Sequence, residues 1–104
     1  MSHITTHVLD SAVGKPAAGV PVALFQNGEL LADGRTDADG RVSDLGPDLL
    51  ENGGYTLLFD TAAYFGDTPN FYPSITIDFT ISDASHYHVP VLLSPFAFST
   101  YRGS

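Results

Sequence analysis

Residues 74–81 read Ser-Ile-Thr-Ile-Asp-Phe-Thr-Ile, and this stretch decides the class of fold. Its apolar side chains occupy every second position, at Ile75, Ile77, Phe79 and Ile81, while Ser, Thr and Asp fill the positions between. Successive side chains of a β-strand point to opposite faces. The alternation therefore predicts a strand with one face against a core and the other in solvent.

Several other segments favour strands, and turn signals separate them. Residues 20–25 and 30–32 flank Asn27-Gly28, a dipeptide typical of the tight turn in a β-hairpin. Further strands are predicted over 4–9, 55–59, 86–93 and 96–101. Seven or eight short strands of this kind favour two packed antiparallel sheets.

One segment suits a helix. Residues 60–65 begin with Asp60, a residue that caps helix N-termini, and Gly66 follows as a stop. Together these elements predict an all-β sandwich with one short helix, in which residues 1–104 form a single domain.

The charge balance excludes two classes of partner. Only Lys15, Arg35, Arg41 and Arg102 are basic, against 12 carboxylates, and the net charge is -8. This charge repels nucleic acid phosphates and anionic lipids, so we expect neither partner. Because the chain has no cysteine, disulfides and thiolate metal sites are excluded as well.

Targeting patterns are not seen in the sequence. The first seven residues contain neither a basic region nor an apolar region of the kind found in signal peptides. No apolar run approaches the ~20 residues that cross a membrane. We therefore expect a cytoplasmic protein that does not interact with membranes.

Four histidines are the first candidates for chemistry. On a strand, His3, Thr5 and His7 share one face, and His86 and His88 also project to one face. A His-x-His pair can hold zinc. Polar residues on a solvent face are nonetheless the more common explanation, because no third ligand has a telling spacing.

Two further features are ambiguous when read alone. Arg41 directly follows the Asp39-Gly40 turn, where a solvated arginine is the usual interpretation. Residues 101–104 follow a predicted strand, and chain ends of this kind usually fray. From the residues alone, the protein is an acidic β-sandwich with histidines on strand faces.

Taken together, five segments resemble one family closely. They are residues 5–10 (TTHVLD), 14–20 (GKPAAGV), 36–41 (TDADGR), 86–95 (HYHVPVLLSP) and 99–104 (STYRGS). Their sequences and order resemble those of the 5-hydroxyisourate hydrolases of the transthyretin-like family. The final Tyr-Arg-Gly-Ser is the most specific segment, because hormone-carrying transthyretins lack it and the matching histidines. Phe-Ala-Phe at 96–98 departs from the more usual Tyr-Gly-Tyr.

The resemblance implies a sandwich of two four-stranded antiparallel sheets with one short helix. It also implies a homotetramer, built as a dimer of dimers, with active sites at the dimer–dimer interface. No metal and no organic cofactor is implied. The implied catalytic residues are His7, Arg41, His88 and Ser104, and the implied substrate-binding residues are His7, Arg41, Tyr101 and Arg102.

The implied reaction belongs to urate degradation. Water opens a lactam bond of 5-hydroxyisourate and yields 2-oxo-4-hydroxy-4-carboxy-5-ureidoimidazoline. A histidine, His7 or His88, can deprotonate water, while Arg41 offers a permanent charge and a planar donor fork to the developing oxyanion. The Ser104 hydroxyl and terminal carboxylate can orient a histidine or the water, and Tyr101 can contact the substrate ring.

Three alternatives remain open at this point: a carrier without catalysis, a structural domain, and a zinc hydrolase that uses His86 and His88. We expect His3, which lies outside the matched motif, to matter little for turnover. Gly103 is expected to let the tail turn sharply in a crowded cleft.

Overall fold

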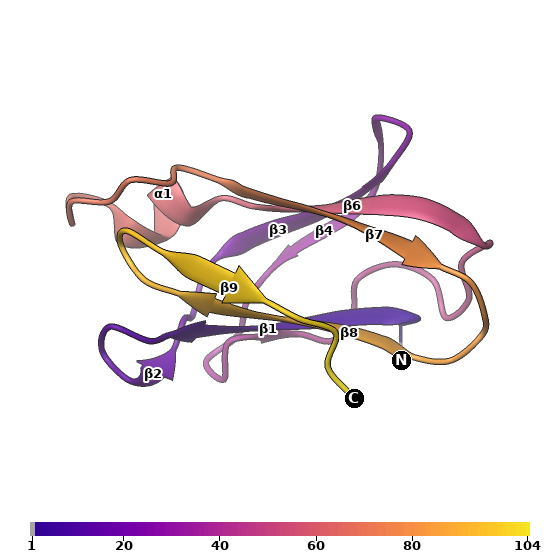
Figure 1. Cartoon of the computed structure of the whole chain (residues 1–104), viewed down its shortest axis with the longest axis horizontal. Helices are drawn as coiled ribbons and strands as arrows, with labels where there is room; N and C mark the ends of the chain where they lie inside the picture. Colours follow the sequence, from indigo (N-terminus) through magenta and orange to yellow (C-terminus); the bar gives the residue numbers. More distant parts are fainter. Residues whose placement is uncertain (1) are drawn as a thin grey trace.

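Two β-sheets pack face to face in the computed structural model, which describes residues 2–104 (Figure 1). Met1, the first residue of the predicted domain, lies outside the described residues. The strands are β1 (Ile4–Asp10), β2 (Lys15–Pro16), β3 (Pro21–Gln26), β4 (Glu29–Arg35), β5 (Arg41–Val42), β6 (Gly53–Phe59), β7 (Ile75–Ile81), β8 (Tyr87–Leu93) and β9 (Phe98–Thr100). One sheet has the order β4-β3-β6-β7. The other has the order β2-β1-β8-β9, and β5 also pairs with β1.

The sheet β4-β3-β6-β7 follows the sequence patterns closely. The predicted hairpin joins β3 to β4, and its turn residues Asn27 and Gly28 both have positive φ, at 51° and 80°. In β7 the side chains of Ile75 and Ile81 are each 1% exposed, and the polar residues between the apolar ones face solvent. The predicted half-buried strand is therefore confirmed.

The other sheet differs from the prediction in one pairing. Strand β1 runs parallel to β8, with Ile4 opposite Tyr87 and Asp10 opposite Leu93, whereas antiparallel pairing was expected throughout. A tight turn forces antiparallel pairing, but no turn joins these two strands and alternation carries no information on direction. On its other edge β1 pairs first with β5 and then with β2, so the sheet is four strands wide despite its five members.

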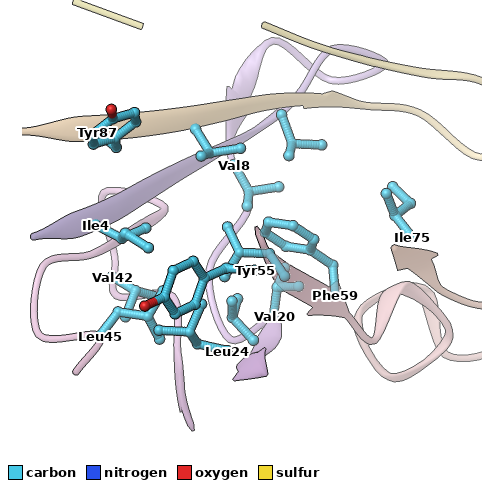
Figure 2. Close-up of a cluster of buried hydrophobic side chains, with 14 of the residues drawn as sticks. Ile4, Val8, Val20, Leu24, Val42, Leu45, Tyr55, Phe59, Ile75 and Tyr87 are labelled. Atoms are coloured by element: carbon cyan, nitrogen blue, oxygen red, sulfur yellow. The ribbon is translucent and has the colours of Figure 1, made fainter. Parts of the chain in front are cut away.

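Apolar side chains from both sheets fill the space between them (Figure 2). Ile4 and Val8 of β1 lie in one cluster with Leu24 of β3 and Phe59 of β6, and each of these side chains is at most 1% exposed. Burying a side chain of this size contributes about 1.5–3 kcal/mol. This cluster holds the sheets together, and with them the positions of the outward-facing residues.

The single predicted helix is confirmed as α1 (Thr61–Phe65), which follows β6. The carboxylate of Asp60 accepts a hydrogen bond from the Ala63 N–H at 3.0 Å, as an N-cap does, and Gly66 ends the helix. Among residues 2–104, no helix is long and apolar enough to cross a membrane.

A buried carboxylate connects this helix to β1. Asp10, which is 6% exposed, accepts hydrogen bonds from the N–H groups of Ala12 and Val13 and from the Tyr64 hydroxyl, the last at 2.6 Å. Burial, followed by the hydrogen bond to Asp10 and its negative charge, raises the pKa of Tyr64 to about 12. The interaction therefore requires a protonated Tyr64.

We expect Tyr64→Phe to lower the free energy of unfolding by about 1–2 kcal/mol at neutral pH, as for a partly exposed hydrogen bond to a charged group. Because the pKa of Tyr64 is raised from 10.0 in the folded protein, this contribution is complete below that pH and is lost as pH rises toward 12. Urea denaturation at several pH values measures it. Tyr72→Phe removes an exposed hydroxyl and is the control. Equal midpoints for the two variants at neutral pH would contradict the role of Asp10.

Candidate active site on the outer face of one sheet

Three predicted site residues lie side by side on β1, β5 and β8. In the register of these strands His7 is opposite Arg41, and Thr5 is opposite His88. Their neighbour Thr6 is fully buried, so Thr5 and His7 point to the other side of the sheet. We call the outer surface that bears Thr5, His7, Arg41 and His88 the histidine face. Pairing of distant strands thus brings together residues that are far apart in the chain.

A tight turn places Arg41. The Asp37 carboxylate accepts hydrogen bonds from the N–H groups of Asp39 and Arg41, at 2.9 and 3.0 Å. Gly40 has φ 75°, and a Cβ there would lie 2.3 Å from the carbonyl oxygen of Val8, so no other residue fits. Within the described part of the chain the Arg41 guanidinium has no hydrogen-bond or ion-pair partner. It is available to a bound molecule.

The same turn sets the proton position on His7. The Nε2 atom of His7 lies 2.8 Å from the carbonyl oxygen of Asp39. Because a carbonyl oxygen only accepts, Nε2 must carry the proton. In the neutral ring Nδ1 then holds the free lone pair, which is the form a general base needs.

The hydroxyl of Thr5 connects two imidazoles. Its Oγ1 atom lies 2.8 Å from Nε2 of His86 and 2.9 Å from Nδ1 of His88. One hydroxyl has one proton, so it donates to one ring and accepts from the other when both rings are neutral. If it accepts from Nδ1 of His88, the Nε2 atom of His88 is left without a proton and can act as a base. In the opposite arrangement Nε2 carries a proton and can act as a donor.

The surroundings of His88 favour its neutral form. Burial lowers the pKa of His88, and the positive charges of Arg41, His7 and His86 lower it further. A neutral His88 is able to take a proton from water near neutral pH. His86 and His88 were the sequence candidates for zinc. Among residues 2–104 no group of three or more His, Cys, Asp or Glu is placed to hold a metal.

The tail, residues 101–104, continues the sheet. Strand β9 pairs Thr100 with Val91, and beyond it Gly103 pairs with His88 in the same antiparallel register. The Gly103 N–H donates to the carbonyl oxygen of His88 at 2.8 Å. Pro90 lies between these pairs and has no N–H, which interrupts the ladder. The tail is therefore an extension of β9, rather than a frayed end.

Alternation sends the tail side chains to two faces. Tyr101 and Gly103 are on the histidine face, and Tyr101 is 59% exposed. Ser104, which follows Gly103, is also exposed. Arg102 points the other way, and its guanidinium carbon lies 4.1 Å from the ring centroid of Tyr87. In the single chain Arg102 thus lies apart from the other predicted substrate-binding residues.

Gly103 has a different role from the sharp turn that the sequence suggested. It is not among the glycines with positive φ. A Cβ at this position would lie 2.7 Å from Cδ2 of His88 and 3.1 Å from Cγ of Pro90. Glycine is needed here because the tail backbone lies directly against the His88 ring.

His3 belongs to the interior. It is 3% exposed, its Nδ1 accepts from the Leu50 N–H at 2.9 Å, and its Nε2 lies 2.8 Å from the carbonyl oxygen of Ser85. Both ring nitrogens are therefore used by the fold. Alternation alone placed His3 on the same face as His7. His3 precedes β1, however, and its ring packs against the Tyr87 ring and under the 47–50 loop.

Two hollows differ in their relation to this face. One of about 520 Å³ lies along β3 and β4, with Asp33, Arg35 and Asp60 in its lining and no histidine. Another of about 310 Å³ lies between β7 and the tail, and His88 and Tyr101 are among its lining residues. Its lining also includes Tyr87, Val89 and Arg102, so the second hollow lies mainly on the side of β8 opposite the histidine face. We give the first hollow no role in the site.

Comparison with known proteins identifies the family of this chain. A family model, the HIUase/Transthyretin family, matches residues 4–103. The chain belongs to that family. The 5-hydroxyisourate hydrolase of Caulobacter vibrioides is 46% identical over 115 residues, which cover 100% of both chains. The structure of Klebsiella pneumoniae 5-hydroxyisourate hydrolase is 41% identical with a TM-score of 0.90, covering 97% of this chain and 98% of that one.

The chain is also similar in fold to a transthyretin. Sea bream transthyretin, solved in complex with thyroxine, has a TM-score of 0.87 and 28% identity, covering 96% of this chain and 93% of that chain. The fold is thus shared with both the hydrolase and the transthyretin. Sequence identity is higher to the hydrolases, at 41% and 46%.

Proposed function

We propose that this chain hydrolyses 5-hydroxyisourate in urate degradation, with His7, Arg41 and His88 as its catalytic centre. The single observation that carries the proposal is the convergence of these three side chains on one face, with an unpaired guanidinium beside two imidazoles. The identity to 5-hydroxyisourate hydrolases supports the choice of substrate. The sequence resemblance pointed to the same residues.

The groups on this face suit hydrolysis of a lactam bond. His88, neutral and hydrogen-bonded through Nδ1, takes a proton from the attacking water, and Arg41 stabilises the oxyanion that forms. His7 contacts the substrate, and either imidazole can return a proton to the departing nitrogen. Ser104 and Tyr101, in the tail, complete the contacts to water and to the substrate ring.

The deciding test is direct. Protein treated with a chelator and added to freshly generated 5-hydroxyisourate should make its absorbance decay faster than in buffer. Thr56→Val, which alters an exposed hydroxyl on the other sheet, is a matched control that should keep the full rate. If the decay with protein equals the spontaneous decay, the proposed function is wrong.

The rate should stay constant to a lower pH than an ordinary histidine base allows. Burial and the charge of Arg41 lower the pKa of His88 below 6.5. A base acts in its neutral form, so a lowered pKa extends the active range on the acidic side. The acidic limb of kcat against pH should therefore be centred below 6.5. A limb centred at or above that pH would assign the base to another group.

We further propose a homotetramer in which subunits cover the histidine face. Large apolar side chains near this sheet stay exposed in the single chain, among them Val13 at 62% and Phe96 at 66%. Association would bury them and enclose the site. Sedimentation at micromolar concentration should give a particle of four chains. A fully active monomer would contradict the arrangement.

A further inference from the structure

The ring of Tyr87 lies on the face of β8 opposite the histidine face. It is held in place there, and we call it the Tyr87 platform. It is 5% exposed, its hydroxyl donates to Asp83 at 3.1 Å, and the same hydroxyl accepts from the Ser82 N–H at 3.0 Å. The His3 ring packs edge-on against it, with centroids 5.5 Å apart. These three neighbouring groups hold the ring in one orientation.

Arg102 lies on that platform. Its guanidinium carbon is 4.1 Å from the Tyr87 centroid, and Nη2 donates to Oγ of Ser85 at 3.3 Å. Hydrogen bonds from Ser85, with a contribution from the Arg102 charge, keep the pKa of Asp83 below its ordinary value. A planar cation stacked on an aromatic ring beside a carboxylate is a well-matched contact for arginine in particular.

The tail therefore contacts β8 on both of its faces. Arg102 contacts Tyr87 on the inner side, and the next residue, Gly103, lies against the His88 ring on the histidine face. One ladder hydrogen bond, from Gly103 to His88, would hold an exposed chain end only weakly. The side-chain contact of Arg102 adds a second attachment beside that hydrogen bond.

We propose that Arg102 is a positioning residue, whose contact with Tyr87 keeps Gly103 against His88 and holds the chain end in place. Its side chain acts through the tail and does not touch the substrate. The consequence for turnover rests on the proposed function, whereas the consequence for His88 does not.

Arg102→Ala should lower kcat roughly 10-fold or more, with a smaller change in KM, because the tail loses its alignment. The pKa of His88 should rise toward its ordinary value of 6.5, because the ring loses the cover that disfavours its charged form. Arg102→Lys keeps the charge without the planar group, so both effects should be intermediate. Methylguanidinium in solution should partly restore kcat of Arg102→Ala.

The experiment combines steady-state kinetics with an NMR titration of the His88 ring protons. Arg35→Ala is the matched control, since Arg35 is an exposed arginine on the other sheet. It should leave both readouts unchanged. An increase in KM alone, with the His88 titration unaltered, would make Arg102 a substrate ligand and overturn the proposal. The proposal would also be overturned if kcat, KM and the His88 titration of Arg102→Ala all matched those of the unmodified protein. If even the unmodified protein is inactive, the His88 titration still decides the positioning role.

Discussion

Arg41→Ala should lower kcat/KM for 5-hydroxyisourate by roughly 10²-fold or more, the loss typical when a donor to a developing oxyanion is removed. The guanidinium has no partner among residues 2–104, so its removal should leave the fold intact. Arg41→Lys should recover only part of the loss, because lysine lacks the planar donor fork. Steady-state kinetics and circular dichroism measure the two effects.

Arg35→Ala is again the control, because it removes one positive charge and leaves the histidine face unchanged. His7→Ala and His88→Ala should cost activity on the same scale as Arg41→Ala, as expected for loss of a general base. If Arg41→Ala and Arg35→Ala hydrolyse the substrate at the same rate, Arg41 does not belong to the site.

Deletion of residues 101–104 should remove most of the activity, also by roughly 10²-fold, while the sandwich stays folded. No residue of the tail belongs to the buried cluster between the sheets, and only Arg102 contacts a member of it, Tyr87, so the melting temperature should change little. It does lie against the ring of His88, which its deletion would expose to solvent. Kinetics and thermal melts on the same samples separate the two quantities.

A one-residue version of this test is Gly103→Ala. The added Cβ would lie 2.7 Å from Cδ2 of His88, so the tail has to move away from the ring. Activity should fall in the same direction as with the deletion. Gly54→Ala is a control, because a Cβ there meets nothing within 4 Å. Full activity of the deleted chain would show that the tail is not part of the site.

Local patterns in the sequence were enough to predict much of the fold. Alternation predicted β7, the Asn27-Gly28 turn predicted the hairpin, and Asp60 with Gly66 predicted the helix. Each of these features depends on neighbours in the chain. The parallel pairing of β1 with β8 depends on contacts between distant segments, which alternation does not record.

The candidate site also has features that the sequence could predict and others that depend on contacts between distant segments. Family resemblance identified His7, Arg41 and His88, and the structure brings them together. Thr5 was missed as a partner of the histidines. The one signal for it was its position on the same strand face as His7, because its distance from His88 depends on the register between β1 and β8.

Residue type alone also did not predict where a side chain lies when strand register or a covering loop decides its exposure. Arg102 has the charge of a substrate ligand, yet the pairing of Gly103 with His88 turns its side chain to the reverse face. His3 has the type of a catalytic residue, yet a loop and Ser85 use both of its ring nitrogens. Neither outcome could be derived without the positions of distant segments.

The pairing of β1 with β8 also sets an order of events during synthesis. Residues 21–81 contain every strand of the sheet β4-β3-β6-β7, so that sheet can form while the chain is still growing. The sheet with the histidine face joins residues 4–10 to residues 87–93, and β1 must wait for β8 to be made. Such distant contacts close slowly. The nascent protein therefore carries a half-finished sandwich with an open apolar side, and its histidine face is completed last.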